Sequence, residues 1–342
     1  MPRALALVAN NLAADMARST FDHDGIAPRD VTLISGRRLT QDWLRACGRF
    51  LQFERTASLA FLGQVNTLGF YLRAVPTLKR ALKDPELTDI YIVNVENILM
   101  IHALRFAERH PGVRLTVLAE GNMNFQPMSP RNRTWWRWLM RPLAARLFGL
   151  AYRAPTTHLS GAFEPRVDRV VSYSARHLQA PAQKVLVLPI APVDAEVVPA
   201  ADTVLVLATA LNYFMTAADY RRFKAAFSRW IKTLGAKRVL IKLHPNYDTA
   251  GIEHAIDGAE IYDEARAIEA VASRIPAARV VGFWTTGLMT LRQIRPDLEC
   301  IDFGHDFYTK AAYHGDPSIK TVLEASGVTM VAAAPFLERP GR

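Results

Sequence analysis

Short apolar runs that alternate with longer amphipathic stretches are the feature that most constrains the fold of this chain. We interpret each run in the first half as a buried strand, because it is brief, rich in branched residues and bounded by polar or turn-forming residues. These runs are residues 4–9, 30–35, 57–63, 89–95, 114–120, 169–174 and 184–190. Helical patterns lie between several of them, such as residues 98–112, which end in basic residues, proline and glycine. The alternation predicts an α/β fold with a parallel sheet covered by helices.

A proline-rich stretch divides the pattern into two parts. Residues 189–202 contain three prolines and almost no periodicity, which is typical of a linker. After it we predict further strands at 203–209, 238–243, 278–283 and 298–304, with helices at 216–235 and 263–275. The sequence therefore predicts two Rossmann-like, doubly wound domains facing each other across a cleft. We place the N-terminal domain at 1–190, the linker at 191–202 and the C-terminal domain at 203–342.

Length and composition indicate a globular protein with a sizeable core. Half of the 342 residues are hydrophobic. The only cysteines, Cys47 and Cys300, are far apart and lack the spacing of a zinc site, which fits a reducing cytoplasm. The first apolar run is too short for a signal peptide, and no uninterrupted apolar stretch reaches the roughly 18 residues that cross a bilayer. We expect a cytoplasmic protein that is soluble or peripheral at a membrane.

The charge of the chain favours anionic partners. The formal net charge is +10, and the densest basic stretch, residues 131–153, interleaves arginines with tryptophans and leucines. This composition suits the surface of an anionic membrane. The alternative is an ordinary amphipathic helix that packs Trp135, Leu139 and Leu143 on the core. Nucleic acid is not favoured as a partner, because the chain contains no recognised nucleic-acid module.

Three polar motifs follow predicted strands, where ligands bind in open α/β sheets. Dinucleotide binding is poorly supported, because no GxGxxG follows the first strand. ATP-driven chemistry lacks its usual signal as well, because no GxxxxGK[ST] loop occurs. The three motifs are Glu120-Gly121 after the strand at 114–120, His244-Pro245 after 238–243, and Thr285-Thr286-Gly287 after 278–283.

Each motif suggests a chemical role and has a structural alternative. Glu120 is a candidate base for a sugar hydroxyl, or else a capping or salt-bridged surface residue. Lys242 and His244 share one face of a strand and are suited to neutralise a phosphate and protonate a leaving group, or else are ordinary strand-end residues. Thr285 and Thr286 open a helix whose N-terminus favours a phosphate, although threonine is also a common helix cap.

Polar residues after two other strands are weaker candidates for ligand contacts. Asn10 and Asn11 follow the first strand, and Asn94, Glu96 and Asn97 follow the strand at 89–95. Asparagine is common in any loop after a strand, so these positions alone do not distinguish a site from a turn.

Taken in order, the three motifs resemble those of the bacterial sialyltransferases of GT-B fold, especially the polysialyltransferase and lipooligosaccharide sialyltransferase group. That family has two carboxylates followed by glycine, then an HP motif, then a Ser/Thr pair. The corresponding segments here read LAEGNMNF, KLHPNY and GFWTTGLM. The resemblance extends over the architecture of most of the chain but over only a few motif residues. One departure is Ala119, which stands where the family has its first carboxylate.

The resemblance implies an inverting transfer from a CMP-activated sugar acid to a glycan or glycolipid acceptor, without an essential metal or other cofactor. Glu120 would deprotonate the acceptor, His244 would bind or protonate the departing phosphate, Pro245 would contribute to binding, and the two threonines would hold the phosphate. Sialic acid, other nonulosonates and Kdo share the CMP group, and such enzymes build surface polysaccharides such as capsule or lipopolysaccharide. If the family's base is the acid that Ala119 replaces, Glu120 must act from the neighbouring position, or activity is altered or lost.

Two alternatives remain open from the sequence. One is a UDP-sugar transferase or epimerase of similar two-domain fold. The other is a degenerate homologue that recognises glycans or membranes without catalysis, which the loss of the first motif acid would explain.

Overall fold

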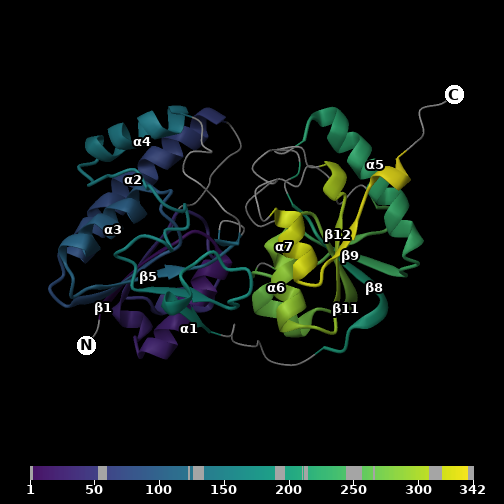
Figure 1. Cartoon of the computed structure of the whole chain (residues 1–342), viewed down its shortest axis with the longest axis horizontal. Coiled ribbons are helices and arrows are strands. Elements are labelled where there is room, and N and C mark those ends of the chain that lie inside the picture. Colours follow the sequence, from purple (N-terminus) through teal and green to yellow (C-terminus); the bar gives the residue numbers. More distant parts are fainter. Residues whose placement is uncertain are drawn as a thin grey trace. The chain divides into compact units, whose positions relative to one another are not determined.

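The computed structural model describes residues 3–52, 60–121, 124–125, 135–188, 197–209, 211, 215–243, 256–264, 266–307 and 318–337, without the side chains of 60–67 and 135–139. The chain forms two compact units, Met1–Ile190 and Ala191–Arg342. Each contains a parallel sheet covered by helices (Figure 1). Among the described helices, none combines the length and hydrophobicity needed to cross a membrane.

The sheet of the first unit is doubly wound. Its strands are β1 (Arg3–Val8), β2 (Val31–Ser35), β3 (Arg49–Gln52), β4 (Leu87–Ile92), β5 (Arg114–Leu118), β6 (Arg169–Ser172) and β7 (Val185–Val187). They pair in parallel in the order β3-β2-β1-β4-β5-β6-β7. Residues 4–8 of the central strand β1 are all buried, as expected where helices cover both faces. The order reverses between β1 and β4, and this switch point is where such sheets bind ligands.

Helices cover the two faces of this sheet. They are α1 (Asn11–Asp24), α2 (Ala60–Leu82), α3 (Ile98–Arg109) and α4 (Trp135–Leu147). Figure 1 shows α1 on one side of the sheet and α2, α3 and α4 on the other. Helix α1 begins after the capping residue Asn10 and ends at Gly25, whose φ of 69° favours glycine. Helix α3 ends at Arg109, is capped by His110 and is followed by Pro111, which confirms the helix predicted within residues 98–112.

Two sequence interpretations in this unit were wrong. Residues 60–63 begin helix α2 instead of completing a strand at 57–63, whose residues 57–59 lie outside the described part of the chain. A short apolar run does not distinguish a strand from the first turn of a helix, and here the helical period continues to Leu82. Leu143 is exposed on α4, so the interpretation that it packs on the core also fails. The buried residue of that turn is the small Ala145.

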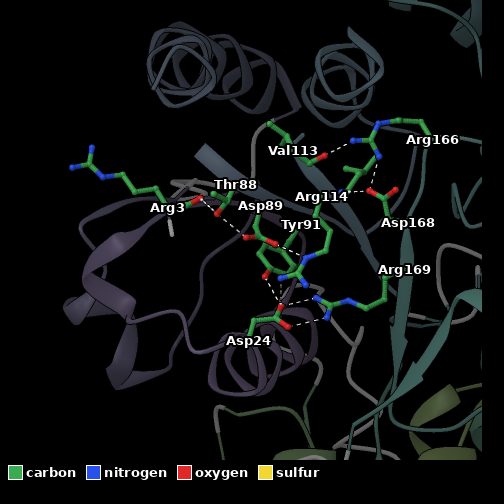
Figure 2. Close-up of polar contacts among 11 residues, drawn as sticks. Arg3, Asp24, Thr88, Asp89, Tyr91, Val113, Arg114, Arg166, Asp168 and Arg169 are labelled. Atoms are coloured by element: carbon green, nitrogen blue, oxygen red, sulfur yellow. Dashed lines mark hydrogen bonds and ion pairs between the residues drawn. The ribbon is translucent and has the colours of Figure 1, made fainter. Parts of the chain in front are cut away.

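A buried ion network holds the C-terminal end of α1 at the amino ends of the strands. Figure 2 shows Arg114 and Arg169 converging on Asp24. Arg169 donates to the two Asp24 oxygens at 2.8 and 2.6 Å, Arg114 lies 3.0 Å from one of them, and the Tyr91 hydroxyl donates at 2.8 Å. Arg114 also donates to Asp89 at 2.6 Å. Burial acts to raise the pKa of Asp24, but the Arg169 and Tyr91 hydrogen bonds and the Arg114 charge hold it below its usual range.

The second unit contains another doubly wound sheet. Its strands are β8 (Ala200–Leu207), β9 (Arg238–Lys242), β10 (Glu260–Ile261), β11 (Ala277–Gly282), β12 (Glu299–Phe303) and β13 (Thr329–Val331). They pair in parallel in the order β10-β9-β8-β11-β12-β13, so the switch point lies between β8 and β11. Helix α5 (Ala217–Thr233) covers one side, and α6 (Thr286–Ile294) and α7 (Ile319–Ala325) cover the other (Figure 1).

The second unit also departs from the sequence pattern in two places. The helix predicted at 263–275 is a 3₁₀ helix over Glu269–Arg274, with Val271 outside helical backbone angles. Strand β8 begins at Ala200, inside the stretch interpreted as linker. The core behind β8 and β11 is aromatic, with Phe223 and Phe227 packed edge-on against Phe283 at 5.2 and 5.0 Å.

Candidate functional site

A cavity of about 690 Å³ lies at the switch point of the first sheet. Val8 and Ala9 reach it from the end of β1, and residues after β2 and β4 complete one wall. Helices α2, α3 and α4 supply the other wall, including Tyr71 and Phe148, whose rings stack at 5.4 Å. Its volume is in the range of pockets that hold small-molecule ligands.

The residues after β4 meet on this cavity. Asn94, Glu96 and Asn97 all line it. Asn94 accepts a hydrogen bond from the Glu96 amide at 2.9 Å, and Asn97 caps α3 by accepting from the Leu99 amide at 2.9 Å. As single positions in the sequence these residues did not distinguish a site from a turn, whereas the structure brings them together at the N-terminus of a helix.

Glu120 lies beyond the end of β5 and is held by Asn10. The Asn10 side chain caps α1 by accepting from the Ala13 amide at 2.8 Å, and its NH₂ group donates to the Glu120 carboxylate. Asn124 donates to the Glu120 carbonyl oxygen at 2.6 Å, and Gly121 follows in a turn with a φ of 72°. The structural alternative of a salt-bridged surface residue does not describe this position, because the carboxylate is held by an amide within the fold.

The environment of Glu120 suits a base. Burial raises the pKa of its carboxyl, and the Asn10 hydrogen bond and the Arg37 charge oppose this without cancelling it. A carboxyl whose pKa lies above the usual glutamate range is a stronger proton acceptor once it is ionised. Arg37 also lines the cavity, and its positive charge acts on the Glu120 carboxyl. Sequence reasoning missed Arg37, although it follows a predicted strand as Ser35-Gly36-Arg37.

Asn11 has a structural role in the observed fold. It is buried, its side-chain oxygen accepts from the Thr40 amide at 3.2 Å, and its carbonyl accepts from the Gln41 side chain at 2.8 Å. These contacts fasten the segment after β2 to the start of α1. Asn10 and Asn11 are therefore not equivalent, and Asn10 is the one that contacts a candidate catalytic group.

In the second unit, the threonine motif opens α6 at the switch point. Thr285 is the helix cap, and its hydroxyl accepts from the Gly287 amide at 3.2 Å. Thr286 is buried, and its carbonyl accepts from the Thr290 hydroxyl at 3.0 Å. The cap that the sequence offered as an alternative is thus present. It leaves the Thr285 hydroxyl proton able to donate to an anion, because this oxygen acts as the acceptor in the cap.

A buried acid holds the turn that leads into α6. Trp284 has a φ of 52°, which is unusual for a bulky residue. Its amide donates to one oxygen of Asp302 at 2.5 Å, while the other oxygen has no hydrogen-bond partner among the described residues. Burial raises the pKa of Asp302 well above its usual range. Asp302 therefore fixes a strained turn directly before the threonine motif.

Lys242 is buried at the end of β9, and its ammonium group donates to the Glu264 carbonyl. Burial lowers the pKa of Lys242, although the charges of Glu264 and Glu269 oppose the effect. Glu269 lies close to the threonine motif, since one of its carboxylate oxygens would be 3.6 Å from a Cβ added at Gly287. Sequence reasoning missed it because it lay inside a predicted helix. His244 and Pro245 lie outside the described residues.

The described residues contain no cluster of three or more His, Cys, Asp or Glu side chains that could hold a metal ion. Glu120 and Asn10 lie together in the first unit, and the Thr285 motif lies with Asp302 and Glu269 in the second. That the two groups face each other across a cleft stays a prediction.

Comparisons with known proteins show the fold. No protein-family model matches the chain, and no curated protein sequence matches it. Among solved structures, the α/β-galactoside α-2,3-sialyltransferase of Photobacterium phosphoreum is 10% identical, with 96% of this chain and 98% of that chain covered and a TM-score of 0.57. S. aureus MnaA, solved with UDP, is 9% identical over 95% and 87% of the two chains, with a TM-score of 0.51.

A third similar structure is the UDP-GlcNAc 2-epimerase of Neisseria meningitidis bound to UDP-GlcNAc, 10% identical over 97% and 88% of the two chains, with a TM-score of 0.47. Identities this low establish the architecture and not the activity. The chain has a GT-B-like fold of two parallel Rossmann-like sheets, an architecture similar to that of the sialyltransferase and of S. aureus MnaA.

Proposed function

We propose that the chain is an inverting glycosyltransferase that uses Glu120 as its base and a CMP-linked sugar acid as its donor. The observation that carries this proposal is the Glu120 carboxyl, which has a raised pKa, is held by Asn10 and feels the charge of Arg37, a residue that lines the cavity. The similarity in fold to a sialyltransferase supports the reaction class. The motif resemblance favours CMP over UDP as the nucleotide.

In the proposed reaction, Glu120 accepts the proton of an acceptor hydroxyl while the hydroxyl oxygen bonds to the anomeric carbon of the donor. The bond from that carbon to the phosphate oxygen breaks, and the phosphate retains the electron pair and leaves as CMP. The Thr285 hydroxyl and the N-terminus of α6 stabilise the negative charge, and His244 supplies a proton to it. A monophosphate carries less charge than a diphosphate, so helix-end donors are suited to it.

The acceptor is proposed to be a glycan or glycolipid that enters the cavity between β1, β4 and the helices. Asn94, Glu96 and Asn97 are placed to contact its hydroxyl groups, since all three line the cavity. The buried Lys242 already donates to a backbone carbonyl, so the proposal does not depend on its reaching the phosphate.

A second candidate is a UDP-sugar transferase or epimerase, favoured by the similarity to the UDP-bound S. aureus MnaA. The two candidates differ in the nucleotide that is released. The purified protein is incubated separately with labelled CMP-Neu5Ac, CMP-Kdo and UDP-GlcNAc, and nucleotide release is followed with and without glycan acceptors. We expect release of CMP from one of the first two donors. Turnover of UDP-GlcNAc alone would contradict the proposal and support the second candidate.

The third possibility, a homologue without catalytic activity, rests on Ala119 in place of the family's first acid. In that case CMP and CMP-sugars would bind, as measured by calorimetry, while none of the donors would be turned over. That result would contradict catalysis by Glu120 and preserve only the binding part of the proposal.

A further inference from the structure

Helices α2 and α4 together expose large apolar side chains. The residues concerned have relative exposures between 40% and 77%, and they are Leu68, Leu72, Met140, Leu143 and Leu147. We call this surface the α2–α4 face. The two positions on α2 are four residues apart, and those on α4 follow a spacing of three and four, so each helix presents one stripe.

The two stripes belong to neighbouring helices. The Tyr71 ring of α2 stacks on Phe148, which directly follows α4, and the Lys79 ammonium donates to the Phe148 carbonyl at 2.9 Å. Figure 1 also shows α2 and α4 next to each other on the same side of the first unit. Other exposed large apolar residues in the described chain are dispersed over separate elements, such as Phe163, Val198 and Ile294. An apolar surface gathered on two helices indicates an interaction site, whereas scattered residues do not.

The charged residues of the two helices that form the α2–α4 face have a single sign. Residues 60–83 and 121–163 contain no Asp or Glu. The exposed cations there include Arg73, Arg80 and Arg146. An apolar centre with a cationic border complements an anionic lipid surface, where leucines enter the interface and arginines meet the headgroups. A second copy of the chain would bring the same cations against one another, so a symmetric dimer is disfavoured.

We propose that the α2–α4 face docks on the surface of an anionic membrane. Leu68 and Met140 belong both to this face and to the lining of the cavity, so the cavity opens beside the docked surface. This step rests on the proposed function. With the cavity beside the membrane, the acceptor is a glycan attached to a lipid, with the lipid in the membrane and the glycan in the cavity.

The test is sedimentation of the full chain with vesicles of phosphatidylcholine, alone or with phosphatidylglycerol. Wild-type protein is expected to pellet with the mixed vesicles and much less with the neutral ones. The double variant Leu143→Glu/Leu147→Glu is expected to bind mixed vesicles at least about tenfold more weakly, because two exposed leucines that would enter the membrane interface are replaced by negative charges facing the anionic surface. Arg80→Glu/Arg146→Glu is expected to reduce the difference between the two kinds of vesicle.

Matched controls lie on other surfaces. Val198→Glu changes an exposed apolar residue and Arg221→Glu an exposed cation of the second unit, and both are expected to bind vesicles like wild type. Equal pelleting of wild type and the Leu143/Leu147 variant, or no pelleting at all, would overturn the proposal. A wild-type dimer in sedimentation velocity that this variant abolishes would assign the face to a second copy instead. Turnover of a water-soluble donor is expected to be unchanged in the variant, so failure of membrane docking and failure of the proposed function are distinguishable.

Discussion

Replacing Asn10 tests how the candidate base is held. The Asn10 side chain caps α1 at 2.8 Å and donates to Glu120. In Asn10→Ala the loss of the cap costs about 1 kcal/mol, and the loss of a hydrogen bond to a charged group costs about 1.5–3 kcal/mol. We therefore expect a destabilisation of about 2.5–4 kcal/mol at a pH where Glu120 is ionised. The loss is smaller at a pH where Glu120 is protonated, because that hydrogen bond then joins neutral groups.

Asn10→Ser is the matched control. Serine caps a helix about as well as asparagine, but it is shorter and has no NH₂ group to offer Glu120. Asn10→Ser is therefore expected to be about 1 kcal/mol more stable than Asn10→Ala at every pH. Both variants should raise the pKa of Glu120, since they remove a contact that lowers it. The assays are urea denaturation at several pH values and the acid limb of the pH–rate profile, which should move to higher pH in both. An acid limb that stays in place in both variants would refute the role of Asn10.

Two further predictions concern buried acids whose pKa shifts have opposite signs. Asp24→Ala should cost about 3–5 kcal/mol in urea denaturation, because it leaves the mostly buried Arg169 without its carboxylate partner; Asp22→Ala, at an exposed pair, should cost at most about 1 kcal/mol. Folding lowers the pKa of Asp24, so its stabilisation of the folded state is present above the unfolded pKa and is lost as pH falls through the folded pKa. Equal acid sensitivity of wild type and Asp24→Ala would contradict the network. Folding raises the pKa of Asp302, so the wild type should lose stability as pH rises from the unfolded pKa of Asp302 through its folded pKa. Asp302→Asn keeps an acceptor for the Trp284 amide and should remove this slope, and a slope that persists in the variant would show that Asp302 is not its source.

Much of the fold follows from the hydrophobic pattern. Strands such as β1, β5 and β9 were predictable because a central parallel strand is a continuous apolar run bounded by polar residues. The strand β3 was missed because its four residues are only partly buried at an edge, and β13 is similarly short. The residues at 60–63 were misassigned because an apolar run of this length fits a strand and a helix equally well.

The position of a site residue was predictable where it follows the end of a single strand. Contacts between site residues were not predictable, because they depend on the order of the strands in the sheet. Glu120 follows a recognisable strand, so its position was expected. Its contact with Asn10 joins residues 110 positions apart and depends on the order β1-β4-β5, which the sequence pattern does not specify. Arg37 and Glu269 reach their sites through the packing of neighbouring segments, and no local pattern indicates this.

In the proposed reaction, Glu120 removes the proton of the acceptor. The most direct measurement is the rate of sugar transfer from the CMP donor by Glu120→Gln, which keeps an acceptor for the Asn10 amide and removes only the base. We expect a rate about 10²–10⁴-fold below wild type, while Glu86→Gln at the surface retains full activity. Equal transfer rates for wild type and Glu120→Gln would rule out Glu120 as the base.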